Sequence, residues 1–180
     1  MPTRADLLAG FVRDIADFPT PGVVFKDITP LLSDAGAFAT TIDAFVDEFS
    51  GQNVDQVVGI EARGFIVGAP VAYGLGAGFV PVRKAGKLPS VVEGESYVLE
   101  YGDDRLEIHA DALVPGSRVV VIDDVLATGG TAAATTRLTE KLGAEVVGVG
   151  VVMELGFLGG RRQLAGRPVV SLLTYEEPGG

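Results

Sequence analysis

The stretch that decides the fold runs from Val119 to Thr131 and reads VVVIDDVLATGGT. Its apolar first half predicts a buried strand of a parallel sheet, because it lacks the alternation of apolar and polar residues that a half-exposed strand shows. Small residues follow where that strand ends, which is the edge at which α/β proteins bind their ligands. The backbone N–H groups of residues 127–131 can surround a phosphate there, and a helix beginning at this loop would add the positive end of its dipole.

Two acidic residues, Asp123 and Asp124, stand between this strand and the loop. Two carboxylates beside a phosphate would repel it unless they accept hydrogen bonds from sugar hydroxyls or face a hydrated Mg²⁺. The loop is not a Walker loop, because no Gly-Lys-Ser/Thr follows, and it is not a dinucleotide fingerprint, because Gly-x-Gly-x-x-Gly is absent. A ribose phosphate is the ligand that fits what remains, and the alternative is a structural strand end with two acids in a turn.

The rest of the chain continues an alternation of strands and helices. Apolar runs of the buried-strand type lie at residues 56–60, 78–82, 118–122, 146–152 and 168–173. Helical spacing of apolar residues, or a helix-length segment between strands, predicts helices at residues 7–15, 38–49, 64–73 and 131–142. This order indicates a single α/β domain over residues 1–180, with a mostly parallel sheet that is covered by helices on both faces.

The segment 84–110 interrupts this order, since it is rich in Gly, charged residues and Tyr. Alternating runs at 96–99 and 105–108 predict a mobile β-ribbon within it. Long connections in compact domains are usually functional lids or disordered linkers, and a lid over an active site excludes water during the reaction. We therefore predict that residues 84–110 form a lid.

Composition limits the class of protein and the kind of partner. The chain has 47% hydrophobic and 21% charged residues, which predicts a folded domain, and it has no Cys, which excludes disulfides and thiolate metal sites. A net charge of −10 opposes binding to nucleic acid or to an anionic membrane. Residues 1–14 contain no apolar h-region, and no stretch approaches the roughly 18 uninterrupted apolar residues of a membrane helix, so we expect a soluble, cytoplasmic protein.

Basic residues cluster once in this acidic chain, at Arg83, Lys84 and Lys87. The cluster is either a solvated loop or a site for a small, strongly anionic ligand. His109 is the single His, and without a second imidazole or a thiolate near it in the sequence we expect it to be structural.

The pattern over residues 119–131 resembles the phosphoribosyl pyrophosphate signature of the type I phosphoribosyltransferases. From about Asp17 to Tyr175 the chain is similar to the adenine phosphoribosyltransferases within that family. The resemblance implies their α/β fold, with an N-terminal helix and a base-covering hood over residues 1–32 and a flexible catalytic lid over residues 84–110. It also implies their activity in purine salvage, in which ribose 5-phosphate passes from phosphoribosyl pyrophosphate to adenine, giving AMP and pyrophosphate.

The resemblance gives two of the quoted motifs a role in binding the substrates. Residues 18–27, FPTPGVVFKD, resemble the family's hood over adenine. Phe25 would stack on the base, the backbone of Val24 and Lys26 would hydrogen-bond its edge, and Leu126 would cover its other face. The phosphoribosyl group would be bound by Asp123, Asp124, Ala127, Thr128, Gly129, Gly130 and Thr131.

Two further motifs resemble the family's pyrophosphate-binding segments. Residues 61–65, EARGF, resemble a loop that carries a cis peptide, which would fall here at Glu61-Ala62. Residues 83–89, RKAGKLP, resemble the second segment, although family members often carry a basic residue where this chain has Ala85. The residues implied to bind pyrophosphate are Arg63, Arg83, Lys84 and Lys87.

The segment Leu99-Glu100-Tyr101-Gly102 in the expected lid resembles the family's catalytic segment. Glu100 would then be the catalytic residue, stabilising the sugar cation or handling the purine proton. Mg²⁺ would arrive with phosphoribosyl pyrophosphate and would not be held by the protein alone. The resemblance also implies a homodimer.

Two other functions are compatible with the same motifs. The acceptor could be hypoxanthine, guanine or xanthine instead of adenine, although the hood and the Leu-Glu-Tyr-Gly segment favour adenine. A non-catalytic sensor of phosphoribosyl pyrophosphate or purines could also keep this pocket. Against a sensor that binds DNA, the chain is acidic and has no room for an added DNA-binding module.

Overall fold

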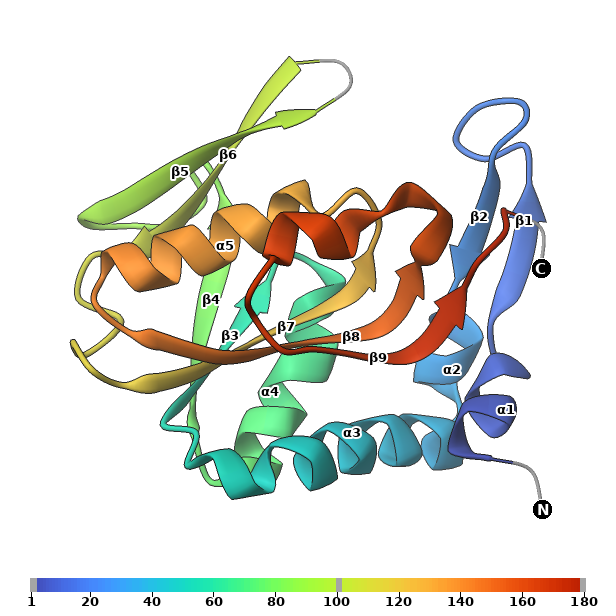
Figure 1. Cartoon of the computed structure of the whole chain (residues 1–180), viewed down its shortest axis with the longest axis horizontal. Coiled ribbons are helices and arrows are strands. Elements are labelled where there is room, and N and C mark those ends of the chain that lie inside the picture. The colour runs from blue at the N-terminus through green and yellow to red at the C-terminus, as the bar shows by residue number, and fades with distance from the viewer. Residues whose placement is uncertain (1–2, 100–101, 179–180) are drawn as a thin grey trace.

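The computed structural model describes residues 3–99 and 102–178. Within these residues the main sheet has seven strands (Figure 1). In their order across the sheet they are β5 (Val92–Leu99), β6 (Gly102–His109), β4 (Gly78–Lys84), β3 (Gln56–Ile60), β7 (Arg118–Leu126), β8 (Glu145–Leu155) and β9 (Val169–Tyr175). The strands from β4 to β9 pair in parallel, whereas β6 pairs antiparallel with both β4 and β5. The predicted α/β fold with a mostly parallel sheet is confirmed.

Helices cover both faces of this sheet (Figure 1). Two long helices, α3 (Ala35–Phe49) and α4 (Arg63–Leu75), lie on one face, and α5 (Gly130–Lys141) lies on the other. The shorter elements are α1 (Arg4–Ala9), α2 (Thr29–Ser33), η1 (Ser50–Gln52), η2 (Gly156–Leu158) and η3 (Gly160–Leu164). None of the helices in the described ranges is long and apolar enough to cross a membrane.

The central strand β7 joins the two hydrophobic cores. Val119 and Val121 belong to the core beneath α5, and Val120 and Ile122 belong to the core beneath α3 and α4. Successive side chains of a strand point to opposite faces, so a strand covered on both faces needs an uninterrupted apolar run. This double burial explains why the sequence 119–122 contains no polar residue.

The strand β7 continues past the predicted end at residue 122. Asp123 pairs with Val151 of β8, and Leu126 pairs with Glu154. The acids Asp123 and Asp124 are therefore part of the strand instead of following it. The physical reason is that β8 is long and offers backbone partners as far as Glu154.

The predicted helix over residues 7–15 is wrong in its second half. The helix α1 ends at Ala9, and residues Arg13–Ala16 form β1, which pairs antiparallel with β2 (Val24–Asp27). Ile15 lies opposite Phe25 in this hairpin. The apolar spacing is helical, but the backbone hydrogen bonds offered by β2 outweigh that local preference.

The predicted ribbon within residues 84–110 is present as the β5–β6 hairpin, which projects from the edge of the sheet (Figure 1). Its base is held on α5 by two ion pairs, from Arg137 to Glu95 and from Lys141 to Glu93, each 2.7 Å long. Glu100 and Tyr101, which follow β5 in the sequence, lie outside the described residues. The two ion pairs place the hairpin beside α5, the helix that begins within the Val119–Thr131 stretch.

We predict that truncating the largest buried side chain of the α3 core destabilises the fold. Phe45 is fully buried and stacks on Phe49 with their ring centres 6.4 Å apart. Phe45→Ala should lower the free energy of unfolding by about 3 to 5 kcal/mol, the usual cost of removing a buried ring. Phe38→Ala, on the same helix but only half buried, is the control in urea denaturation. Equal losses for both variants would show that α3 does not pack on the sheet in this way.

Candidate active site

A cavity of about 340 Å³ opens where β3 and β7 end. Parallel strands that are neighbours in a sheet end at the same edge, so the loops that follow them meet there. The segment from β3 into α4 contributes Glu61, Ala62 and Arg63, and the segment from the end of β7 into α5 contributes residues 123–132. The structure thus brings the predicted phosphate loop and the EARGF motif into one cavity.

The predicted phosphate loop, residues 127–131, contains a left-handed residue and leads into α5. Gly129 adopts φ +86°, in the left-handed region that favours Gly, and precedes the first residue of α5. The Gly129 position supplies no side-chain cap, so the first N–H groups of α5 receive no hydrogen bond from it. These donors and the positive end of the helix dipole lie beside residues that line the cavity.

The two carboxylates are buried at the wall of this cavity, with 7% of Asp123 and 5% of Asp124 exposed. Oδ1 of Asp123 accepts a hydrogen bond of 2.9 Å from the backbone N–H of Asp124. Burial raises the pKa of Asp123 well above its usual range, and the neighbouring charge of Asp124 adds to this effect.

Asp124 retains unused hydrogen-bonding capacity. Its Oδ2 lies 2.7 Å from Nε of Arg63 as an ion pair, but the alignment is not that of a hydrogen bond, and within the described ranges this buried oxygen has no hydrogen-bond donor. Buried polar atoms are normally satisfied. A ligand that donates from a hydroxyl group would satisfy it.

A second, more apolar cavity of about 210 Å³ adjoins the first. The two cavities share the lining residues Arg63, Val125 and Ala127. The Phe25 ring lies 5.5 Å from the guanidinium of Arg63 and packs edge-on against Phe18. The remaining lining residues are Val23, Val24, Lys26, Met153 and Leu155. A planar, largely apolar ring suits this space.

Leu126 does not lie where the sequence analysis expected it. Its side chain is 1% exposed and packs in the core beneath α5, and it borders the larger cavity instead of the apolar one. Its neighbours Val125 and Ala127 line the apolar cavity as well as the larger one. Val125 therefore takes the position that had been predicted for Leu126.

Of the four basic residues predicted to bind pyrophosphate, Arg63 lines both cavities in the described part of the chain. Arg83 donates two hydrogen bonds of 3.2 Å to Glu61, which lines the larger cavity. These bonds hold the pKa of Glu61 below its usual value. Lys87 is exposed, and its carbonyl oxygen accepts a 3.1 Å hydrogen bond from Arg83. The predicted cis peptide at Glu61-Ala62 is confirmed.

Lys84 connects this basic segment to the lid. Its Nζ lies 3.0 Å from Oδ2 of Asp104 on β6, and the hydroxyl of Tyr97 on β5 donates to the same oxygen at 3.0 Å. Lys84 lowers the pKa of Asp104, and burial raises the pKa of Tyr97. His109 lies at the end of β6, where its Nε2 is 2.6 Å from the carbonyl oxygen of Pro89, a contact that fits a structural role.

The sequence analysis missed three features of the site. Met153 and Leu155 on β8 line the apolar cavity, and the two-residue alternation of a strand is the signal that could have found them. Gly64 is the third, because a Cβ there would lie 2.9 Å from the Ile122 carbonyl oxygen and 3.0 Å from Oδ1 of Asp123. The absence of a side chain lets α4 begin directly against β7.

The chain is similar to known proteins over most of its length. The family model for the phosphoribosyl transferase domain matches residues 32–168. The adenine phosphoribosyltransferase of Streptomyces coelicolor is 57% identical over 173 residues, which cover 94% of this chain and 95% of that protein.

Two solved structures of adenine phosphoribosyltransferases are also similar. The enzyme from Thermoanaerobacter pseudethanolicus has a TM-score of 0.92 and 48% identity, covering 95% of this chain and 99% of that one. The enzyme from Saccharomyces cerevisiae, complexed with adenine and D-2,5-dideoxy-2,5-imino-altritol 1,6-bisphosphate, has a TM-score of 0.91 and 42% identity, covering 94% and 98%.

We predict that the buried carboxyl of Asp123 makes the ligand-free protein less stable as pH rises. Its raised pKa means that the folded chain keeps a proton that the unfolded chain has lost, so the free energy of unfolding falls above the ordinary Asp pKa. Asp123→Asn keeps the acceptor for the Asp124 N–H but cannot ionise. It should raise the free energy of unfolding at pH 7 by about 1 kcal/mol, because substitutions that remove a destabilising functional group commonly stabilise the fold by about this amount.

Urea denaturation at several pH values measures this effect. Asp43→Asn removes an exposed charge from α3 and is the control, for which we expect little change. A less stable Asp123→Asn variant at pH 7 would contradict the assignment of a strained, buried acid.

Proposed function

This chain belongs to the phosphoribosyltransferase family and has adenine phosphoribosyltransferase activity, and we propose that its two adjoining cavities are the active site. The enzyme is a pentosyltransferase of purine salvage, which transfers ribose 5-phosphate from phosphoribosyl pyrophosphate to adenine and gives AMP and pyrophosphate. The observation that carries the proposal is that the two cavities adjoin and share Arg63, Val125 and Ala127 in their lining. One is lined by a phosphate loop and two carboxylates, and the other suits a planar ring.

The larger cavity is assigned to the phosphoribosyl group. The 5-phosphate binds the backbone of residues 127–131, whose N–H groups stand at the start of α5. Asp123 and Asp124 accept hydrogen bonds from the ribose hydroxyls, and the Oδ2 atom of Asp124 is available for this because it lacks a donor within the described ranges. The side chains of Thr128 and Thr131 add hydroxyl donors at the same loop.

The apolar cavity is assigned to adenine. Phe25 stacks on the ring, and the backbone of Val24 and Lys26 hydrogen-bonds its edge. Val125 replaces Leu126 as the residue that covers the opposite face, because its side chain is the one that lines this cavity. Residues 1–32 then serve as the hood over the base.

Pyrophosphate is assigned to the side of the larger cavity where Glu61 and Arg63 lie. Arg63, Arg83, Lys84 and Lys87 neutralise the charge that develops on the leaving group. Arg83 and Lys84 form ion pairs with Glu61 and Asp104, so binding pyrophosphate exchanges these carboxylates for phosphate oxygens.

Mg²⁺ fits the acidic wall of this cavity. Its preferred ligands are hard oxygens and water, and the buried carboxylates of Asp123 and Asp124 can accept hydrogen bonds from its water shell. We propose that the ion enters bound to phosphoribosyl pyrophosphate. When bound, it would supply positive charge that stabilises the departing pyrophosphate.

The remaining protein groups act on the sugar and the base. As pyrophosphate leaves C1 of the ribose, positive charge builds on the sugar, as in other glycosyl transfers. Closure of the β5–β6 hairpin would exclude water and bring Glu100, which lies outside the described residues, to that cation. Phosphate binding at residues 127–131 orients C1 toward N9 of the base.

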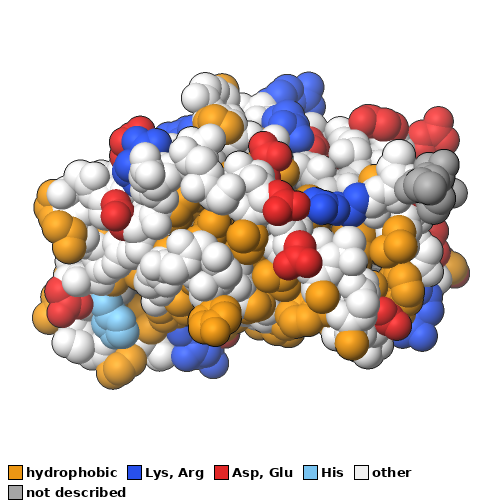
Figure 2. Space-filling model, turned by 90° about the horizontal axis from the view of Figure 1, so that it is seen from below, with side chains coloured by type: hydrophobic (Ala, Val, Ile, Leu, Met, Phe, Trp, Pro, Cys, Tyr) orange, Lys and Arg blue, Asp and Glu red, His pale blue; other side chains and the backbone are white. Residues whose placement is uncertain are grey.

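We also propose that the enzyme is a cytoplasmic homodimer. Large apolar side chains stay exposed on the monomer, and Tyr73 of α4 is 90% exposed with Ile66 nearly half exposed on the same helix. Figure 2 shows the side on which α3 lies, where apolar side chains spread between acidic groups. Exposed apolar patches of this kind commonly mark protein interfaces.

We predict that Glu100→Gln lowers kcat by roughly 10²-fold, with the KM values for both substrates nearly unchanged, because its charge matters only in the transition state. Steady-state rates of pyrophosphate release from adenine, phosphoribosyl pyrophosphate and Mg²⁺ measure the effect. Glu93→Gln is the matched control, since it removes the same charge from the same hairpin and breaks only a solvent-exposed ion pair with Lys141. Near-normal turnover of both variants, or a raised KM with kcat preserved for Glu100→Gln, would refute the catalytic role.

A further inference from the structure

The segment η3 lies directly behind the phosphate loop, and the two backbones touch. A Cβ added at Gly160 would clash with the carbonyl oxygen of Ala127 and lie 2.8 Å from the backbone N of Gly129. A Cβ added at Gly129 would in turn clash with the carbonyl oxygen of Gly160. Only glycines permit so close an approach. The position of η3 therefore limits the position of the phosphate loop.

An ionic network between the buried carboxylate of Glu154 and the half-exposed side chain of Arg161 anchors η3 next to this contact. Arg161 donates to Glu154 of β8, with Nε 3.0 Å from Oε1 and a second guanidinium nitrogen bound to Oε2. The hydroxyl of Ser171 on β9 donates to the same Oε2 at 2.6 Å, and Arg161 also donates to the carbonyl oxygen of Val169 at 2.9 Å. Glu154 is only 6% exposed, and the Arg161 hydrogen bond lowers its pKa.

This network lies on the face of β8 that points away from the adenine cavity. Glu154 pairs with Leu126 at the end of β7, immediately before the phosphate loop. Its neighbours Met153 and Leu155 line the apolar cavity, and alternation along the strand turns Glu154 the other way. Neither Glu154 nor Arg161 lines either cavity of the active site, and both line a separate hollow.

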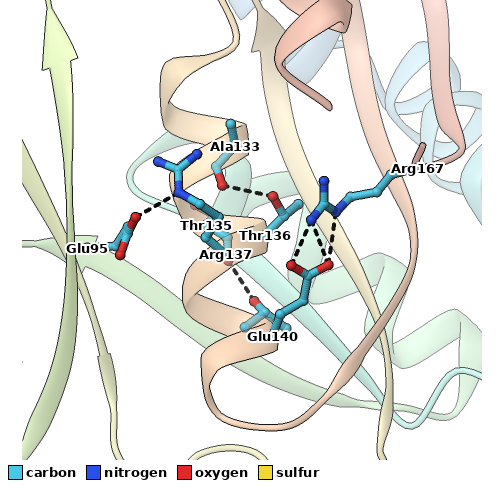
Figure 3. Close-up of polar contacts among 8 residues, drawn as sticks. Glu95, Ala133, Thr135, Thr136, Arg137, Glu140 and Arg167 are labelled. Atoms are coloured by element: carbon cyan, nitrogen blue, oxygen red, sulfur yellow. Dashed lines mark hydrogen bonds and ion pairs between the residues drawn. The ribbon is translucent and has the colours of Figure 1, made fainter. Parts of the chain in front are cut away.

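A second pair of the same chemical type involves Arg167, three residues past the end of η3. Arg167 donates to both carboxylate oxygens of Glu140 on α5, at distances of 2.7 to 3.0 Å. Figure 3 shows this pair on one side of α5, and on the other side the pair between Arg137 of α5 and Glu95 of the lid. Glu140 belongs to the last turn of α5, whereas the phosphate loop precedes its first turn. The Arg167–Glu140 pair therefore offers a matched control for the Arg161–Glu154 pair.

We propose that Glu154, Arg161 and Ser171 form a positioning network that sets donor affinity by fixing Gly160 against the phosphate loop. The inference rests on the proposed role of that loop in binding the 5-phosphate. Loss of the network would let η3 shift, and the loop would lose the geometry in which its N–H groups converge on the phosphate. The adenine cavity is lined by other residues, so base binding would be preserved.

The test compares Arg161→Ala, Glu154→Gln and the control Arg167→Ala. We expect the first two to weaken the binding of ribose 5-phosphate, measured by calorimetry, about tenfold, since small misplacements of binding groups have effects of this order or larger. The KM for phosphoribosyl pyrophosphate should rise in parallel, while the KM for adenine stays within about twofold. Arg167→Ala should leave both ligands unaffected.

The design separates positioning from folding. Arg161→Ala leaves the buried Glu154 carboxylate without its Arg partner and could unfold the chain, whereas Glu154→Gln preserves the shape of that side chain without its charge. Folded variants with wild-type affinity for ribose 5-phosphate would overturn the inference, and so would equal losses for donor and adenine. If the wild-type protein itself failed to bind ribose 5-phosphate, that result would refute the proposed role of the phosphate loop, and also the inference that rests on it.

Discussion

The double burial of β7 is the constraint on which the rest of the structure depends. Helices pack on both faces of this strand, and β3 and β8 pair with its two edges, so its end can occupy only one position. The fixed end of β7 in turn fixes the positions of Asp123, Asp124 and the start of α5. A rigid strand end thereby holds two carboxylates and a set of N–H donors at fixed separations, which is the preorganisation that catalysis by charge stabilisation needs.

This arrangement places function in conflict with stability. Burial raises the pKa of Asp123, and Oδ2 of Asp124 lacks a hydrogen-bond donor within the described residues. Ligand-free, the site holds polar groups that cost folding energy, and the apolar strand around them supplies the compensation. The same groups are the ones that sugar hydroxyls and a hydrated cation would satisfy, so part of the cost of building the site is recovered when the donor binds.

Much of the fold could be predicted, because burial on both faces leaves an uninterrupted apolar run such as 119–122 that is readable without a structure. Features that depend on distant partners could not. Ile15 has helical spacing but pairs with Phe25 in a hairpin. Leu126 was predicted to cover one face of adenine, but its neighbour Val125 lines the apolar cavity. A shift of one residue reverses the face of a strand. The contact between Gly129 and Gly160 joins segments far apart in sequence, and its local sign was a Gly-Gly pair in each segment, at 129–130 and 159–160.

A crystal structure with bound AMP tests the central claim most directly, since one molecule reports on both cavities. The account predicts that the phosphate lies against the backbone N–H groups of residues 127–131, with the ribose hydroxyls on Asp123 and Asp124. The adenine ring should lie between Phe25 and Val125. AMP bound with its phosphate away from this loop, or with its base outside the cavity lined by Phe25, would contradict the account.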